Sequence, residues 1–431
     1  MATKSSQVWL DASMARREWM GRMSAGLLGV TVIPGFAESL LAANQSKAAG
    51  KAKHIIFLTM QGAMSHLDTF DPKPGREVQG NTKAIATKTP GVQFGESLAQ
   101  LADLSEDLAV IRSVNTETGA HEQGMYLMRT SYKEINSIRH PALGAWALHA
   151  MGKISKDLPG NVLIGNANDH PGNGFLDPSV TPVPIADPAK GLENIKSPSY
   201  LSEANFKRRL ILAGRIDDDF RSKFAGTEVD TYTQMYREAV RLIGSKELKA
   251  FNIAEEPEKV REAYGTTRFG QACLLARRLV EGGVRFVEVE LGGWDMHQQI
   301  FNDLPNKAKE LDKGLSNLLK DLKASGLLQS TMVVLATEFG RTPTINENAG
   351  RDHHPAVFSC VLAGAGIRGG QVYGASDQDA RTVASDGVSI ADFNTTIAQA
   401  AGIPTDREFH APNGRPFKIG GGGEAIKKLL A

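Results

Sequence analysis

The sequence predicts an α/β fold, a doubly wound and mostly parallel sheet flanked by helices. Short apolar runs without a helical period, such as residues 332–336, are typical of strands that are covered on both faces. Polar clusters follow several of these runs, as occurs at the carboxyl edge of an open parallel sheet, where ligands bind. An amphipathic helix at residues 304–325 connects two of the runs, which predicts parallel neighbouring strands joined by a right-handed crossover.

Composition and charge narrow the class of protein. The chain has 431 residues and 41% hydrophobic content, which is enough for a large globular core. Its 49 basic and 48 acidic residues give a formal net charge of +1, so it lacks the basic footprint of proteins that bind nucleic acid. Cys273 and Cys360 both lie in apolar contexts and are interpreted as small buried hydrophobes, which excludes a disulfide framework.

Residues 1–43 are interpreted as a twin-arginine-type signal peptide. Arg16 and Arg17 precede a weakly apolar segment at 23–37 and small residues at 41–43. About 15 apolar residues are fewer than the roughly 20 that span a bilayer, so no stable membrane span is expected. The prediction is export by the twin-arginine translocation machinery to the periplasm or medium. The alternative is an ordinary amphipathic helix with an accidental arginine pair. Residues 44–53 read as a linker.

The predicted mature domain, residues 54–431, begins with a strand at 55–60. Four polar side chains follow its carboxyl end and are candidates for binding or chemistry: Gln61, Ser65, His66 and Asp68. Helical signals at 95–106 precede a second strand at 108–114. The segment after that strand places His121 in a loop or at the start of a helix, without the second histidine of an H-E-x-x-H zinc motif.

The middle of the chain adds a third strand at 161–165 and a surface insertion at 166–199, rich in Asn, Gly, Asp and Pro. Residues 201–282 have a mostly helical pattern. The next strand, 284–291, ends in the segment G-G-W-D-M-H, which contains Asp295 and His297. After the connecting helix, strand 332–336 ends in T-E-F-G-R, which contains Glu338 and Arg341. A further strand is expected at 356–363 and a helix at 390–401.

The crossover places the two polar segments at the same edge of the sheet, and G-R-D-H-H-P follows too closely to reach the opposite edge and return. Asp295, His297, Glu338 and at least one of His353 and His354 are therefore predicted to share one coordination shell. Carboxylates and imidazoles suit a divalent metal such as zinc, manganese or iron, and calcium is also considered. The candidate ligands are Asp295, His297, Glu338, Asp352, His353 and His354.

Other side chains are assigned to catalysis or substrate binding. Arg341 is expected to bind a tetrahedral oxyanion with two parallel hydrogen bonds. Ser65 is a candidate nucleophile in a Ser65, His66 and Asp68 triad, although these residues are crowded in one loop without a G-x-S-x-G elbow. The candidate substrate-binding residues are Gln61, His66, Asp68 and Arg351.

Four segments, T-E-F-G-R-T-P, G-R-D-H-H-P, G-G-W-D-M-H and Q-G-A-M-S-H-L-D-T-F-D-P-K-P-G, resemble the signature segments of the bacterial family called domain of unknown function 1501. That family belongs to the alkaline phosphatase and sulfatase superfamily, and the resemblance extends from about residue 54 to the end. It implies a doubly wound α/β fold with an active site at the carboxyl edge of the sheet. A twin-arginine leader is common in the family.

The resemblance also shows departures from the superfamily pattern. Gln61 or Gly62 stands where the superfamily enzymes usually carry an aspartate ligand, and Glu338-Phe339 replaces Asp-His or Asp-Asn. The segment H-E-Q-G-M-Y-L-M-R-T-S is similar in layout to the sulfatase nucleophile segment. It puts His121 in the nucleophile's place, as a transient phosphoryl acceptor or as a metal ligand.

The function expected from these observations is metal-assisted hydrolysis of phosphate or sulfate esters outside the cytoplasm, with a small-molecule or glycan anionic ester as substrate. The alternative is a non-catalytic binding protein of the cell envelope on a decayed sulfatase-like fold.

Overall fold

The computed structural model assigns residues Gly50–Ala431 to one compact unit. The predicted signal peptide and most of the predicted linker lie outside the residues that the structure describes. The described residues are 52–193, 202–223, 238–243 and 245–431.

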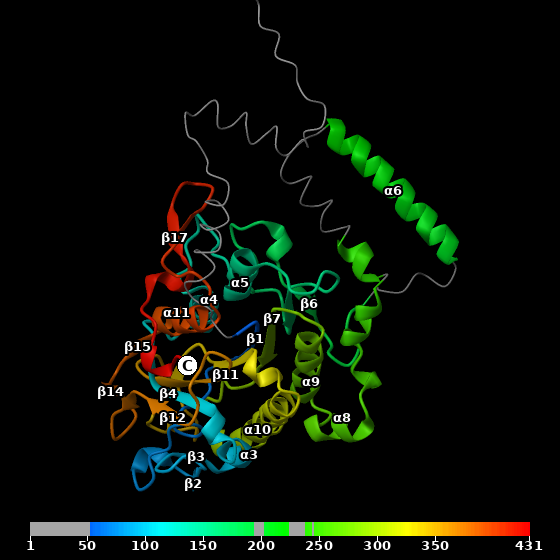
Figure 1. Cartoon of the computed structure of the whole chain (residues 1–431). Coiled ribbons are helices and arrows are strands. Elements are labelled where there is room, and N and C mark those ends of the chain that lie inside the picture. Colours follow the sequence, from blue (N-terminus) through cyan, green and yellow to red (C-terminus); the bar gives the residue numbers. More distant parts are fainter. Residues whose placement is uncertain (1–51, 194–201, 224–237, 244) are drawn as a thin grey trace, which may run out of the picture. The chain divides into compact units, whose positions relative to one another are not determined.

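A central sheet organises the described part of the chain (Figure 1). It has nine strands in the order β12-β4-β11-β8-β1-β7-β5-β6, with β15 paired to β4. The strands are β1 (His54–Met60), β4 (Leu108–Asn115), β5 (Asn161–Ile164), β6 (Val183–Ile185), β7 (Phe286–Leu291), β8 (Thr331–Ala336), β11 (Phe358–Gly364), β12 (Gln371–Tyr373) and β15 (Val388–Ser389). Only β11 runs antiparallel to its described neighbours, β4 and β8. The predicted α/β class with a mostly parallel sheet is confirmed.

One predicted adjacency is wrong. Strands β7 and β8 are both parallel to β1, but β1 lies between them, with Met60 opposite Leu291 and Thr59 opposite Ala336. The connecting helix α10 (Ile300–Ala324) is long enough to pass over one intervening strand. A crossover helix between β7 and β8 therefore predicts that the two strands are parallel, but it does not predict that they are adjacent. Since adjacent strands are about 4.8 Å apart, the ends of β7 and β8 are separated by about 10 Å. The Gln61-Gly62 turn lies between them.

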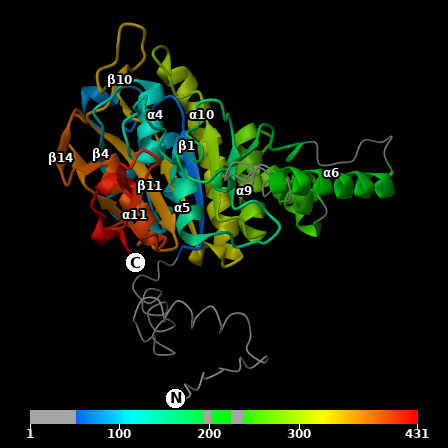
Figure 2. The ribbon, with the colours of Figure 1, turned by 90° about the horizontal axis from the view of Figure 1, so that it is seen from above.

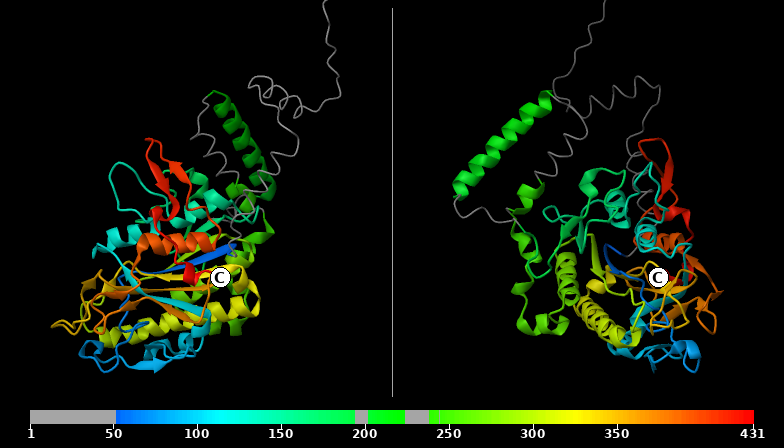
Figure 3. Two further views of the ribbon diagram at one scale, coloured as in Figure 1. Left: turned by 60° about the vertical axis from the view of Figure 1, so that its left-hand side comes forward. Right: turned by 180° about the vertical axis from the view of Figure 1, so that it is seen from behind.

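Helices cover both faces of the sheet, as Figures 2 and 3 show. Strand β1 alternates, with Ile56 and Leu58 in the core beneath α9 (Arg268–Glu281) and α10. Ile55 and Phe57 point into the opposite core. That second core also contains side chains of α4 (His121–Thr130), α5 (Leu143–Met151) and α11 (Ile390–Ala400). Apolar cover on both faces explains the continuous hydrophobic runs.

The other elements are short or lie outside the sheet. The helical signals at 95–106 correspond to a 3-10 turn at Glu96–Leu98, α3 (Ala99–Ala102) and a second 3-10 turn at Ser105–Asp107. Within 201–282 the described helices include α6 (Glu203–Lys223), α8 (Glu258–Tyr264) and α9. Among the described residues, none of the helices combines the length and apolarity that a membrane crossing requires.

Small two-stranded pairs complete the described structure. They are β2 (Ala84–Ala86) with β3 (Gln93–Gly95), β9 (Gly340–Arg341) with β10 (His353–His354), β13 (Ala375–Ser376) with β14 (Val383–Ser385), and β16 (Glu408–His410) with β17 (Pro416–Lys418). Part of the predicted surface insertion, β6, joins the edge of the main sheet beside β5. Residues 194–199 of that insertion lie outside the described residues.

Candidate metal centre

Three elements bring polar side chains together beyond the carboxyl ends of β1, β7 and β8. The loop after β7 carries Asp295 and His297. Strand β10 folds back on β9, which places His353 opposite Arg341. Helix α4 starts with His121, so this imidazole stands at the helix end beside the sheet edge.

Asp295 is the centre of this cluster. Its Oδ1 atom lies 3.0 Å from Nε2 of His297, and 3.3 Å from Nε2 of both His121 and His353. The Nε2 atoms of His297 and His353 are 3.0 Å apart. Ligand atoms on His121, Asp295 and His353 all lie within 4.8 Å of one another. Donor atoms bound to one zinc or manganese ion would be separated by about 3 to 4 Å.

Hydrogen bonds to the other ring nitrogen assign the tautomer of each histidine. Nδ1 of His121 lies 2.8 Å from Oε1 of Glu338, and Nδ1 of His297 lies 2.8 Å from Oδ1 of Asp352. Nδ1 of His353 lies 2.6 Å from the carbonyl oxygen of Gly119. A carboxylate and a carbonyl only accept, so each Nδ1–H donates, and Nε2 of a neutral ring carries a lone pair. Metal-binding histidines are held by such partners.

The donor set therefore fits a divalent cation. Three Nε2 lone pairs and one carboxylate repel each other unless a positive charge lies among them, and of these four atoms Arg341 contacts only Asp295 Oδ1 and His297 Nε2. Nε2 of His121 is buried and has no hydrogen-bond partner among the described residues. Imidazole and carboxylate donors suit zinc, manganese or iron, whereas calcium takes six to eight oxygen ligands.

Arg341 contributes a fixed positive charge to the cluster. The prediction that its guanidinium binds an oxyanion with two parallel hydrogen bonds is wrong, because its N–H groups already donate to groups of the protein. Its buried guanidinium donates to the carbonyl oxygens of Ala63, at 3.0 Å, and Arg351, at 3.1 Å. It also bonds to the carbonyl of Gly62, to Asp295 Oδ1, and to Nε2 of His297 at 3.4 Å. All five N–H groups are thus committed. Burial opposes ionisation of Asp295, but the hydrogen bond and the charge of Arg341 outweigh it and lower the pKa of Asp295 to about 2.

Two predicted ligands lie behind the cluster. Glu338 is 1% exposed and accepts hydrogen bonds from His121 Nδ1, from the Gly62 N–H at 2.8 Å, and from Thr337 Oγ1 at 3.1 Å. Asp352 accepts from His297 Nδ1 and from Asn346 Nδ2. The structure places both carboxylates where they orient an imidazole. Spacing along the chain could not separate this role from direct coordination.

Replacing Glu338 with glutamine is expected to weaken metal binding about 10- to 100-fold without abolishing it. Glutamine is nearly isosteric and keeps an acceptor for His121 Nδ1–H, but it removes the charge that polarises the ring. Metal content and the dissociation constant of the purified variant measure this effect. Complete loss of metal would instead make Glu338 a ligand, and an unchanged constant would contradict an orienting role.

Among the remaining predicted site residues, Gln61 lies in the turn after β1, and Ser65, Asp68 and Arg351 form a separate buried network. Arg351 donates to Asp68 Oδ2 at 2.8 Å, and Ser65 Oγ donates to the same oxygen at 2.5 Å. Nε2 of His66 lies 3.2 Å from the carbonyl of Ala380, and Nε2 of His354 lies 2.8 Å from the carbonyl of Arg381. No hydrogen bond between Ser65 and His66 is found in the described structure. The proposed triad is therefore not assembled, and His354 points away from the cluster.

Burial of His66 predicts that the free energy of unfolding depends on pH. Complete burial lowers the pKa of its imidazole to about 4, against an ordinary value of 6.5. Between these pH values the unfolded chain binds a proton that the folded chain rejects. Stability is thus fully present above pH 6.5 and falls as pH decreases toward 4, by roughly 2 to 3 kcal/mol. Urea unfolding at pH 7 and pH 4.5 should show a smaller pH effect in His66→Gln; an identical effect in both proteins would contradict the assignment.

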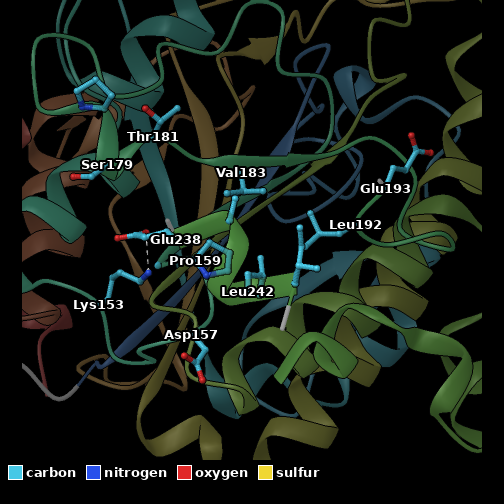
Figure 4. Close-up of a pocket in the computed structure, with 14 residues that line it drawn as sticks. Lys153, Asp157, Pro159, Ser179, Thr181, Val183, Leu192, Glu193, Glu238 and Leu242 are labelled. Carbon is cyan, nitrogen blue, oxygen red and sulfur yellow. Dashed lines mark hydrogen bonds and ion pairs between the residues drawn. The ribbon is translucent and has the colours of Figure 1, made fainter. Parts of the chain in front are cut away.

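Two cavities differ in their relation to the cluster. A polar cleft of about 570 Å³ opens beside Asp295, with walls from the loop after β7 and the start of α10. Its lining includes Gln298, Asp303, Asn306 and Lys307. A more apolar cavity of about 350 Å³ lies near the start of β5 and β6, lined by Pro159, Val183, Leu192 and Leu242 among others (Figure 4). None of its lining residues belongs to the cluster, so the polar cleft is the better substrate site.

Two glycines shape the centre; sequence reasoning noted Gly62 only as a departure from the superfamily pattern and missed Gly119. Gly62 has φ +106°, and a Cβ atom there would lie 2.5 Å from the Asp295 nitrogen. Its N–H donates to Glu338. Gly119 supplies the carbonyl that orients His353. The sequence feature that could have indicated their role is position: Gly62 follows a predicted strand, and Gly119 comes shortly before His121.

Comparisons with known proteins place the chain in a family. The family model described as "Protein of unknown function (DUF1501)" matches residues 52–430. No curated protein matches the sequence. Similar solved structures include the PsFucS1 sulfatase from Pseudoalteromonas sp., at 13% identity and a TM-score of 0.36 over 85% of this chain and 70% of that one.

Two further structures show comparable likeness. The lipoteichoic acid synthase LtaP from Listeria monocytogenes has 11% identity and a TM-score of 0.37, over 89% of this chain and 78% of that chain. A protein in the alkaline phosphatase superfamily from Vibrio parahaemolyticus has 10% identity and a TM-score of 0.39, over 89% and 71% respectively. At these identities and TM-scores, the three structures assign no residue role and no activity to this chain.

Proposed function

Since the chain belongs to the DUF1501 family of proteins of unknown function, we propose its function from the site itself: a metal-assisted hydrolase of phosphate or sulfate esters. The observation that carries the proposal is the buried Nε2 of His121, which has no hydrogen-bond partner among the described residues, lies 3.3 Å from Asp295 Oδ1 and is near His353. A divalent metal bound there would activate water and polarise a phosphoryl or sulfuryl oxygen.

The chain's own residues would prepare the site in three ways. Glu338 and the Gly119 carbonyl hold His121 and His353 with their Nε2 atoms toward Asp295. Arg341 keeps Asp295 ionised. A divalent ion would be the group that attracts an anionic substrate, because Asp295 offsets the charge of Arg341, and the carboxylates of Glu338 and Asp352 lie behind the rings of His121 and His297. The polar cleft beside Asp295 has room for the rest of the ester.

A second candidate is a non-catalytic binding protein of the cell envelope. The observation in its favour is Arg341, whose guanidinium already contacts both Asp295 Oδ1 and His297 Nε2. The cluster then contains an internal cation and would persist as a polar network without metal. This candidate predicts a protein that is purified free of metal and stays inert.

Metal analysis separates the two candidates. The full chain is purified, its metal content is measured, and arylphosphatase and arylsulfatase activities are assayed before chelation, after chelation and after addition of zinc or manganese. Bound metal, and activity that is lost and restored with it, supports the hydrolase. A protein that neither carries nor takes up metal, and is inert throughout, overturns the hydrolase in favour of the binding protein.

We also propose export through the twin-arginine pathway, on the basis of Arg16, Arg17 and the short apolar segment that follows them. Replacement of both arginines with lysine is expected to retain the protein in the cytoplasm, because the twin arginines are the feature by which this signal is identified. Cell fractionation with an antibody to the folded domain measures the distribution. Unchanged export of the double variant would contradict the proposal.

A further inference from the structure

A buried network of charged side chains joins α4 to β7, the two elements that position His121 and Asp295. Arg129, in the last turn of α4, donates from Nε to Glu288 Oε1 at 2.8 Å and from Nη2 to Glu290 Oε1 at 2.5 Å. The three side chains are 3%, 5% and 6% exposed. One guanidinium therefore ties the helix to two successive residues of one face of the strand.

Both carboxylate oxygens of each glutamate in the network accept a hydrogen bond. The second oxygen of Glu288 accepts from His170 Nε2 at 2.9 Å, and the second oxygen of Glu290 accepts from the Asn166 N–H at 2.5 Å. Nδ1 of His170 accepts from the Gly172 N–H, so this ring is neutral and donates from Nε2. The loop after β5, which carries Asn166 and His170, is thereby attached to the same strand.

The position of these glutamates is unusual for a central strand. Strand β7 alternates, with Val287 and Val289 in the core beneath α9 and α10, and Glu288 and Glu290 on the opposite face. Well-packed apolar side chains at such positions are often as stabilising as a buried ion pair or more so. Stability alone is therefore a weak reason for this network. Buried charges are directional, however, and can select one arrangement of the elements that they join.

The geometry points to a positioning role. We infer that Arg129, Glu288, Glu290 and His170, which we call the α4–β7 clamp, fix α4 against β7 and thereby set His121 Nε2 against Asp295 Oδ1. Arg129 lies eight residues after His121 on α4, a rise of about 12 Å, and Glu290 lies five residues before Asp295. A shift of the helix along the strand would move His121 away from the other donors. The inference rests on the proposed metal centre.

The test compares two lysine variants of the full chain. Lysine cannot bridge two carboxylates as arginine does, so Arg129→Lys loosens the clamp. Arg277→Lys is the matched control, because Arg277 also bonds to two glutamates, Glu256 and Glu281, but lies on α9, which carries no candidate ligand. Zinc dissociation constants are measured by competition with a chromophoric chelator, and melting temperatures by calorimetry. Arg129→Lys is expected to weaken zinc binding about 10-fold or more, and Arg277→Lys to leave it unchanged.

A second variant keeps the inference testable if Arg129→Lys fails to fold. The triple change Arg129→Met, Glu288→Leu and Glu290→Met removes the charges together and is expected to fold, with a lower melting temperature because His170 Nε2–H and the Asn166 N–H lose their acceptors. It should still bind zinc about 10-fold more weakly or worse, because apolar packing does not fix the helix along the strand. A purely structural network would lower the melting temperature of the variants and leave the zinc affinity of the folded protein unchanged.

The outcomes separate this inference from the proposed function. Wild-type affinity in the folded Arg129 variants, with zinc bound by the wild-type protein, overturns the clamp and leaves the metal centre intact. Weakened affinity in the Arg129 variants alone supports the clamp. Equal weakening by Arg277→Lys overturns a specific role for the network. A wild-type protein that binds no zinc overturns the metal centre and the clamp together.

Discussion

Asp295→Asn is expected to abolish metal binding and any hydrolysis that depends on it. Asp295 Oδ1 is the atom that Nε2 of three histidines approaches to within 3.0 to 3.3 Å, and it supplies the negative charge of the cluster. Changes to residues that only orient a ligand cost about 10- to 100-fold in affinity, so loss of this carboxylate should exceed about 100-fold. Metal content after purification and zinc titration measure the loss.

Folding should survive this change, because an asparagine oxygen can still accept from Arg341. Asp303→Asn is the matched control: Asp303 is an exposed aspartate in the wall of the same cleft and lies outside the cluster. It should retain wild-type affinity. Full metal occupancy in Asp295→Asn, or equal losses in both variants, would contradict the centre described here.

Gly62→Ala is expected to destabilise the fold by about 3 kcal/mol or more. The residue has φ +106°, and its new Cβ would lie 2.5 Å from the Asp295 nitrogen and 2.8 Å from the Trp294 nitrogen. Both contacts are with backbone, which cannot rotate away as a side chain would. The loop after β7 must therefore move away from the end of β1, which also separates Asp295 from His121 and weakens metal binding.

Gly91→Ala isolates the effect of backbone strain. Gly91 has φ +76°, and nothing lies within 4 Å of its added Cβ, so only the unfavourable conformation remains, at about 1 to 2 kcal/mol. Urea unfolding of both variants gives the two free energies of unfolding, and zinc titration gives the affinities. Equal destabilisation by the two changes would show that the close approach of Gly62 to the loop after β7 contributes nothing.

The cluster at the sheet edge shows how much of the candidate site could be predicted from the residue pattern. Apolar runs identified the strands, and polar segments after them identified the edge, because both follow from local periodicity and from parallel connection. Asp295, His297 and His353 are found together, as the spacing predicted. The same spacing also predicted Glu338 and Asp352 as metal ligands, whereas in the structure they accept hydrogen bonds from His121 and His297. Sequence separation does not determine which way a side chain points.

What the sequence by itself determined is the α/β class, the DUF1501 family and the edge at which the polar groups gather, since these depend on local patterns and motifs. Tertiary structure alone decided that β1 lies between β7 and β8, that the N–H groups of Arg341 donate to acceptors within the protein, and that Arg129 joins α4 to β7. These features depend on contacts between residues far apart in the chain. Their geometry is determined by packing, and no periodicity or motif records it.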